Sequence, residues 1–134
     1  MKKKLAVGGE NFPNMIRNHC YYVDKTGFIR TVMESESRGL LVTRPRRFGK
    51  TLFIDTVKSF LQIDFVNPGA ATKNASLFSG LAVMQQRDFC AAFMGQYPVI
   101  SISLKGVEGA SYEKAYRRLA GKLSEVAKQY EFLL

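Results

Sequence analysis

The sequence has few of the residues that build metal centres, disulfide frameworks and membrane segments. It contains one histidine, His19, and two cysteines, Cys20 and Cys90, in 134 residues. The cysteines lie far apart and match no metal-ligand spacing, so we expect free thiols in a reducing cytoplasm and no metal site at His19. No apolar stretch approaches the ~20 residues of a membrane span, and the apolar run behind the basic start is too short for a secretory signal.

Proline is scarce, and acidic side chains are outnumbered by basic ones. Four prolines and an apolar content of 46% indicate a globular chain, and its length allows one domain at most. Twenty lysines and arginines against eleven acids give a net charge of +9. This charge favours a polyanionic partner, such as a nucleotide, a nucleic acid or a membrane surface, although a basic chain can also be merely soluble.

Hydrophobic periodicity predicts an α/β fold with parallel strands and flanking helices. We expect a basic start and loop over residues 1–20, and a helix after residue 26 that Asp24 or Thr26 caps. Strand, loop and helix should occupy residues 40–62, and strand and helix residues 97–130, with Ser111 as the last cap. A loop at residues 67–80 and a helix at residues 87–96 lie between them. The predicted buried faces are Phe53, Ile54, Val57, Phe60 and Leu61 on one helix and Tyr112, Ala115, Tyr116, Leu119, Leu123, Val126 and Tyr130 on the last.

The loop before the helix at residue 50 ends like a phosphate-binding loop. Such a loop has the form G-x-x-x-x-G-K-[ST] between a strand and a helix, and Gly49, Lys50 and Thr51 fill its last three places. Gly49 lets main-chain amides approach a triphosphate, and the helix directs its positive end at the same phosphates. Lys50 can reach the outer phosphates, and the hydroxyl group of Thr51 can complete a Mg²⁺ shell.

Arginine replaces the first glycine of this pattern. Arg44 stands in that place, and Pro45 pushes Arg44 toward an extended backbone, so the chain leaves the strand by another route. Arg44, Arg46 and Arg47 concentrate positive charge beside Lys50, where a phosphate would sit. The surrounding strand and helix make this a stronger signal than an isolated Gly-Lys-Thr.

Four segments together resemble a known family. The strings YYVDKT at residues 21–26, TRPRRFGKT at 43–51, LFSGL at 77–81 and YPVISISLK at 97–105 are similar to the AAA-ATPase-like family, in which the phosphate loop itself begins with arginine. In those bacterial and archaeal proteins, an N-terminal P-loop ATPase domain commonly precedes a PD-(D/E)XK nuclease-like domain.

The resemblance implies a function, cofactors and site residues. Residues 1–134 would be the N-terminal portion of a P-loop NTPase fold that is incomplete at its C-terminus, with ATP and Mg²⁺ as cofactors. Lys50 would be the catalytic phosphate ligand and Thr51 the metal ligand, and nucleic acid would be a partner of the nuclease-like domain. The implied nucleotide-binding residues are Arg44, Pro45, Arg46, Arg47, Phe48, Gly49, Lys50, Thr51 and Leu52.

Hydrolysis requires an acid that this sequence does not supply. A second apolar strand should end in an acid that holds Mg²⁺ through water. None of the eleven acids follows such a strand, and residues 97–104 end without one. The family's equivalent strand would follow residue 134, so we expect no Walker B strand, negligible turnover and unpaired sheet edges.

Two other interpretations stay open. The net charge and the loop arginines also fit a basic nucleic-acid-binding module. Lys114, Arg118 and Lys122 make a basic stripe on the last helix, for which a solvated helix face is favoured over a nucleic-acid surface. Most aromatic residues fall at core-like spacing rather than between basic residues, and we expect Tyr21, Tyr22 and Phe48 to serve packing. The third interpretation is an inactive fragment.

Overall fold

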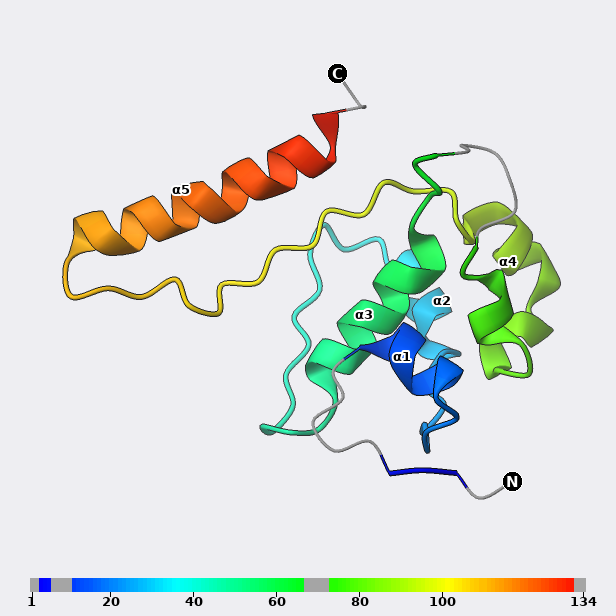
Figure 1. Ribbon diagram of the computed structural model, residues 1–134. Helices are drawn as coiled ribbons and strands as arrows, with labels where there is room; N and C mark the ends of the chain where they lie inside the picture. Colours follow the sequence, from blue (N-terminus) through cyan, green and yellow to red (C-terminus); the bar gives the residue numbers. More distant parts are fainter. Residues whose placement is uncertain (1–2, 6–10, 67–72, 132–134) are drawn as a thin grey trace. The chain divides into compact units, whose positions relative to one another are not determined.

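The computed structural model describes residues 3–5, 11–66 and 73–131. The chain divides into two compact units, Met1–Tyr97 and Pro98–Leu134. In the described ranges no helix is both long and apolar enough to cross a membrane. The regular elements there are the helices α1 (Phe12–Arg17), α2 (Phe28–Met33), α3 (Lys50–Leu61), η1 (Ala75–Phe78), η2 (Ala82–Gln85), α4 (Arg87–Phe93) and α5 (Tyr112–Gln129) (Figure 1).

The predicted α/β fold with parallel strands is wrong. Residues 40–45 and 98–104 are extended, yet neither segment joins a sheet within the part of the chain that the structure describes. Strand-like pairing there is limited to two isolated bridges, one of which joins Gln62 to Tyr97. An apolar run becomes a strand only when a neighbour supplies a continuous hydrogen-bond ladder. Among the described residues these two segments have no such neighbour.

Helix α3 lies at the centre of the first unit and begins at Lys50, as predicted. Phe53 and Phe60 of the predicted buried face are buried, whereas Ile54 is 54% exposed. Thr56 takes a core position instead, and its hydroxyl group donates a 2.8 Å hydrogen bond to a carbonyl one turn earlier. The buried stripe is therefore rotated toward residues 53, 56 and 60.

Four phenylalanine rings join the helices of the first unit. Phe12, Phe60 and Phe78 are fully buried, and Phe89 is almost so. The ring centroids lie 5.0 Å apart for Phe12 and Phe78, 5.4 Å for Phe60 and Phe78, and 5.7 Å for Phe60 and Phe89. These spacings are typical of favourable aromatic pairs. The cluster connects α1, α3, η1 and α4.

Helix α1 falls inside the segment that the sequence indicated as loop. Pro13 occupies its first turn, where a missing N–H costs no intrahelical bond, and Asn11 caps the helix by accepting from the amide of Asn14 at 3.0 Å. The amide of Phe12 donates to Asp55 of α3 at 2.7 Å, and α1 packs against α3 (Figure 1). Breaker residues thus begin a short helix here.

The helices around the predicted loop at 67–80 agree with the sequence in part. Helix α4 confirms the predicted helix within residues 87–96, and α2 confirms the one after residue 26. The predicted loop contains η1, while its residues 67–72 lie outside the described ranges.

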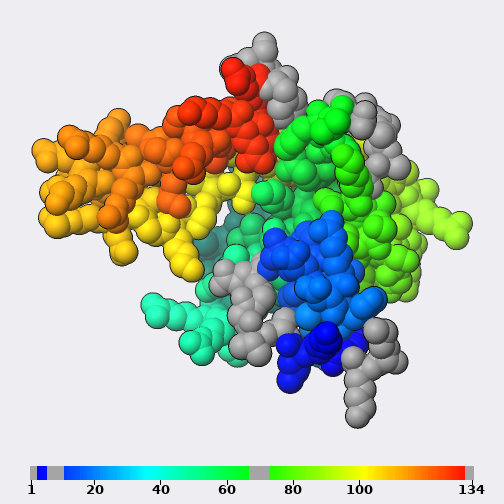
Figure 2. Space-filling view, in the orientation of Figure 1, coloured from blue at the N-terminus to red at the C-terminus, as the bar shows by residue number. Residues whose placement is uncertain are grey.

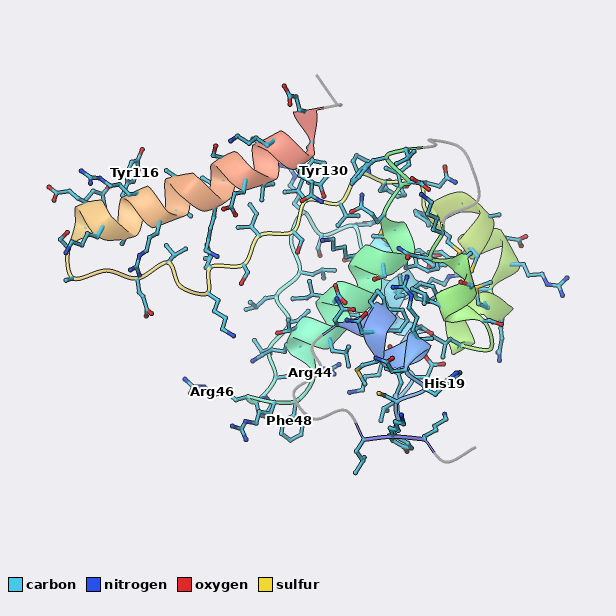
Figure 3. The ribbon with its side chains drawn as sticks, in the orientation of Figure 1. His19, Arg44, Arg46, Phe48, Tyr116 and Tyr130 are labelled. Carbon is cyan, nitrogen blue, oxygen red and sulfur yellow. The ribbon has the colours of Figure 1, made fainter. Side chains whose placement is uncertain are left out.

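In the second unit, Ser111 caps α5 as predicted, accepting from the amide of Lys114 at 3.4 Å. The predicted buried face of α5 is wrong. Tyr112 and Tyr116 are 80% and 58% exposed, and no residue of α5 is buried. Tyr130, directly after the helix, is buried and donates its hydroxyl hydrogen to the carbonyl of Val99 (Figure 3). A helix face is buried only where another element covers it, and within this unit the remainder is an extended segment.

Candidate functional site

The loop from Arg44 to Gly49 runs directly into α3. Gly49 has φ 74° and ψ 25°, and Arg47 has φ 65°, so both adopt the left-handed conformation. A left-handed residue followed by right-handed helix turns successive N–H groups toward one side, which forms a concavity for anions. Gly49 adopts this conformation without steric cost, whereas Arg47 does so at some cost.

The start of α3 has free hydrogen-bond donors. The first turn carries no acid, and among the described residues no side chain caps the helix. The first intrahelical bond of this end runs from the amide of Phe53 to the carbonyl of Gly49 at 2.9 Å. The amides of Lys50, Thr51 and Leu52 therefore have no acceptor within the helix. Together with the helix dipole they favour an anion at this position.

The side chain of Lys50 closes the loop. Its Nζ donates a 2.5 Å hydrogen bond to the carbonyl of Arg44, six residues earlier in the chain. This bond joins the entrance of the loop to its exit and holds the amine beside the loop backbone. The acceptor is a neutral carbonyl rather than a carboxylate, so the bond leaves the positive charge of Lys50 uncompensated.

The other predicted site residues differ in exposure. Pro45, Arg46, Arg47, Phe48 and Thr51 are exposed, whereas Arg44 and Leu52 are half-buried. The loop projects from the surface of the first unit in the turquoise region of Figure 2. Figure 3 shows the side chain of Arg46 extending away from the loop and the ring of Phe48 at its tip. The loop thus joins Lys50 to Arg44 through one bond but does not gather all its arginines at one point.

A cavity of about 300 Å³ opens beside this loop. Two of its lining residues, Met15 and Phe53, are buried, whereas Tyr21, Val23 and Phe48 are 59%, 59% and 62% exposed. The cavity therefore combines an apolar interior with exposed aromatic walls. Its lining residues are Met15, Tyr21, Tyr22, Val23, Lys25, Arg47, Phe48, Gly49, Leu52 and Phe53.

The sequence interpretation missed the role of residues 21–25 in this cavity. Tyr21 and Phe48 were expected to pack in the core or at the base of the loop, and their exposure contradicts the core alternative. Tyr21, Val23 and Lys25 all line the cavity, and they alternate along an extended segment. Alternate residues of an extended chain face the same side. Tyr22, however, also lines the cavity, so a period of two within YYVDKT does not by itself identify this wall.

Asp24 fixes the segment that carries this wall. It was predicted as a helix cap, but Gly27 is the cap residue of α2, and no side chain in the described part of the chain caps that helix. Asp24 instead accepts from the amide and the hydroxyl group of Thr26 at 2.8 and 2.7 Å, and from the amide of Ala82 at 2.7 Å. Partial burial would raise the pKa of Asp24, but these hydrogen bonds outweigh burial and lower the pKa.

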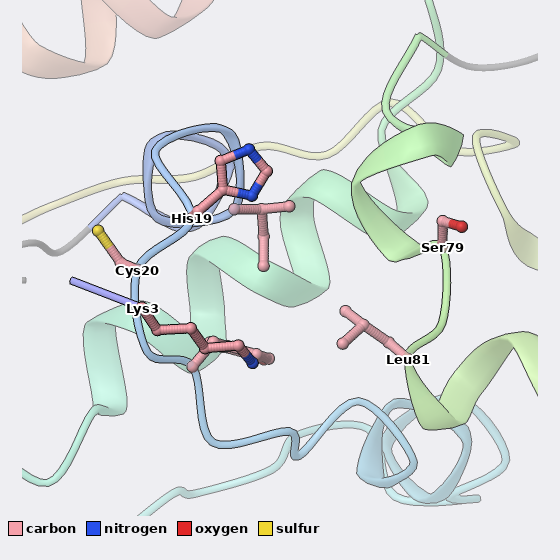
Figure 4. Close-up of a pocket in the computed structure, with 7 residues that line it drawn as sticks. Lys3, His19, Cys20, Ser79 and Leu81 are labelled. Atoms are coloured by element: carbon pink, nitrogen blue, oxygen red, sulfur yellow. The ribbon is translucent and has the colours of Figure 1, made fainter. Parts of the chain in front are cut away.

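A second cavity, of about 330 Å³, lies between the segment at residues 19–22 and the turn at residues 79–81 (Figure 4). Lys3, His19 and Cys20 contribute to its lining, which contains no carboxylate. Cys20 and Cys90 are both free thiols. No group of three or more metal-ligating side chains occurs in the described ranges. The lining thus offers two side chains of metal-ligating type, His19 and Cys20, whereas a protein zinc site uses three or four.

Comparison with known proteins places the chain among related sequences. A family model described as "Predicted AAA-ATPase" matches residues 6–133. A curated protein of Azotobacter chroococcum mcd 1, described as "Uncharacterized protein in vnfD 5'region", is 33% identical over 126 residues. The match covers 93% of this chain and 21% of that relative, so the chain spans about a fifth of the relative's length. No solved structure matches.

Proposed function

The chain belongs to the predicted AAA-ATPase family, and from this premise we propose that it binds ATP with Mg²⁺ through the loop from Arg44 to Thr51. One observation carries the proposal. The amine of Lys50 lies at the junction of a loop with a left-handed Gly49 and a helix whose first amides have no capping side chain among the described residues. This combination offers an anion both main-chain donors and a full positive charge.

The donors suit a triphosphate in number and charge. The amides of Lys50, Thr51 and Leu52 would donate hydrogen bonds to phosphate oxygens, and Lys50 would exchange its bond to the Arg44 carbonyl for a bond to a charged acceptor. A phosphate oxygen carries a negative charge that the carbonyl oxygen lacks, so it attracts the ammonium group of Lys50 more strongly. Arg46 and Arg47, which are exposed, would raise the local concentration of the polyanion.

Magnesium would bind together with the nucleotide. The exposed hydroxyl group of Thr51 is the loop's oxygen ligand, and the remaining ligands would come from phosphate oxygens and water, as is usual for this ion. The ion would neutralise phosphate charge when bound. Thr51 would fix where that charge lies relative to α3.

Replacing Lys50 by alanine tests the proposal. We expect Lys50→Ala to weaken binding of Mg-ATP at least tenfold, because it removes the principal charge on the outer phosphates. Isothermal titration calorimetry on the 134-residue chain measures the affinity. Lys58→Ala, at the other end of the same helix, removes an equal charge and should leave the affinity almost unchanged.

Circular dichroism spectra of both variants show whether α3 is retained, since Lys50 also holds the loop closed. Equal ATP affinity for the wild type and a folded Lys50→Ala variant would contradict nucleotide binding through this loop.

A further inference from the structure

We propose that the cavity between residues 19–22 and the turn at residues 79–81 binds a small organic carboxylate with an apolar body. Two basic side chains, Lys3 and His19, line this cavity of about 330 Å³, and its described lining contains no acid (Figure 4). The volume is at the lower end of the range for small-molecule sites. None of the described lining residues belongs to the loop that we propose for the nucleotide, so this site would bind its ligand independently of ATP.

The end of α1 fixes the position of the His19 ring. The amide of His19 donates to the carbonyl of Ile16 at 3.0 Å. The amide of Cys20 donates to the carbonyl of Met15 at 2.9 Å. These two bonds form a Schellman motif, in which glycine usually takes the left-handed position that His19 occupies with φ 52°. The ring that replaces glycine here has no hydrogen-bond partner among the described residues, so its nitrogens are available to a ligand.

Hydrogen bonds of the neighbouring residue hold Lys3 beside this turn. The amide of Lys4 donates to the carbonyl of His19 at 3.3 Å, and the carbonyl of Lys4 accepts from the amide of Tyr21 at 2.8 Å. Figure 4 shows the side chains of Lys3 and Leu81 extending toward one another from opposite sides of the cavity. The amine of Lys3 lies 6.0 Å from the centroid of the Tyr21 ring, at the outer limit of a cation–π contact. Neither of the two ion pairs found in the described ranges involves Lys3, so no carboxylate there neutralises its charge.

Apolar side chains form the rest of the cavity wall. Ile16, Tyr22 and Leu81 line it, and all three are half-buried. The amide of Leu81 donates to the carbonyl of the fully buried Phe78 at 2.9 Å, which ties this side of the wall to the core. Tyr22 contacts Phe12 edge-to-face, with ring centroids 5.3 Å apart. Both sides are therefore preformed, which reduces the entropy lost on binding.

The lining favours a carboxylate over a phosphate. Phosphate groups are bound well by converging main-chain amides and by arginines. The backbone beside His19 is instead the C-terminal end of α1, which presents carbonyl oxygens, and no arginine is among the described lining residues. The amine of Lys3 and the ring of His19 offer a few compact donors, which suit a single carboxylate. The apolar wall would remove the body of the ligand from water.

Benzoate, which joins one carboxylate to an apolar ring, is the test ligand. We expect benzoate to shift the NMR signals of the backbone amides of residues 16–22 and 79–81 in a saturable manner. Benzamide has the same shape without the charge and should bind about fivefold more weakly. Inorganic phosphate, which has the charge without the apolar body, should leave these signals unchanged.

Variants of the two basic residues test their roles. Lys3→Ala should weaken benzoate binding about fivefold, because it removes the charge that faces the carboxylate. Lys4→Ala is the matched control, since it removes an equal charge from the next residue, which does not line the cavity. His19→Gly should also weaken benzoate binding while it leaves the fold intact, because glycine adopts the left-handed conformation without steric cost.

Three results would overturn the inference. The first is wild-type protein whose amides at residues 16–22 and 79–81 show no saturable shift with benzoate. The second is equal weakening by Lys3→Ala and Lys4→Ala, or equal affinity for benzamide and benzoate, since a specific charge would then play no part. The third is benzoate binding at the phosphate loop, with shifts at residues 44–52 and loss of affinity in Lys50→Ala. The Mg-ATP affinity of Lys50→Ala tests the proposed function separately.

Discussion

At the scale of single residues, Asp24 shows how one carboxylate joins two parts of the first unit. It accepts hydrogen bonds from Thr26 in its own turn and from Ala82, which lies 58 residues further along the chain. Thr26 is fully buried, and its hydroxyl oxygen in turn accepts from the amide of Val83 at 3.1 Å. The carboxylate thus fixes a buried polar group that would otherwise be costly.

The lowered pKa of Asp24 predicts a stability that depends on pH. A group whose pKa is lower in the folded state stabilises the fold above its unfolded pKa, and this contribution is lost as the pH falls through the folded pKa. We expect Asp24→Asn to lower the free energy of unfolding by about 1 kcal/mol at neutral pH, a value discounted for exposure of the side chain. Urea unfolding from about pH 7 down to about pH 3 should show that the difference in free energy of unfolding between the wild type and Asp24→Asn becomes smaller in acid.

Glu36→Gln is the control for this experiment, because it removes one negative charge from an exposed side chain. A difference between wild type and Asp24→Asn that stays constant over the whole pH range would show that the carboxylate charge is not what stabilises this turn.

At the scale of elements, α3 provides both the core of the first unit and the start of the candidate site. We expect Phe60→Ala to lower the free energy of unfolding by about 3–5 kcal/mol, since Phe60 is fully buried between Phe78 and Phe89. Ile54→Ala, on the exposed side of the same helix, should cost less than about 1 kcal/mol. Chemical denaturation that is followed by far-UV circular dichroism measures both.

This pair of variants separates the observed helix face from the predicted one. The sequence pattern placed Ile54 and Phe60 on the same buried face, so it predicts a substantial loss for both substitutions. Similar large losses would mean that Ile54 is buried after all and that the described orientation of α3 is wrong.

The starts of α3 and α5 were predictable from local chemistry, whereas helix α1, burial and pairing were not. Ser111 marks the start of α5, and Gly49 the start of α3, because caps and left-handed glycines act on the nearest turn alone. Burial of Tyr116 and pairing of residues 98–104 depend on what lies opposite, and the pattern of one segment cannot supply that. The same limit explains why the pattern could not tell whether Tyr21 packs in the core or at the base of the loop.

The candidate site was predictable where it is continuous in sequence. Residues 44–51 form one loop that could be identified from spacing, and the structure adds the bond between Lys50 and the carbonyl of Arg44. The cavity beside it combines Met15, residues 21–25 and α3, which lie up to 38 positions apart (Met15 to Phe53). Such a site depends on the packing of α1 against α3, which no single motif contains.

At the scale of the whole molecule, the net charge of +9 is compatible with nucleic acid as a ligand as well as with a nucleotide. If nucleic acid binds the loop arginines, its affinity should fall steeply with salt and should survive Thr51→Ala. We expect the opposite for the nucleotide: Mg-ATP binding should fall several-fold with Thr51→Ala, because the metal loses a ligand. Fluorescence anisotropy of a short labelled single-stranded DNA measures the affinity for nucleic acid, and calorimetry measures the affinity for Mg-ATP.

Arg46→Ala, in an exposed part of the loop, separates the outcomes further. A large loss of DNA affinity with Arg46→Ala, combined with Mg-ATP affinity that is indifferent to both magnesium and Thr51, would favour the nucleic-acid-binding module over the proposed function.

The left-handed backbone of Arg47 has a consequence for how the loop responds to heat. A residue other than glycine in this conformation is about 1–2 kcal/mol less stable than in the right-handed one, so the loop relies on its few bonds to keep its shape. On heating, we expect this loop to lose its structure before the phenylalanine cluster unfolds. Ligand affinity would then fall at temperatures at which the helices are still folded. A bound polyanion would stabilise the loop and raise the temperature of its local unfolding, without changing the stability of the core.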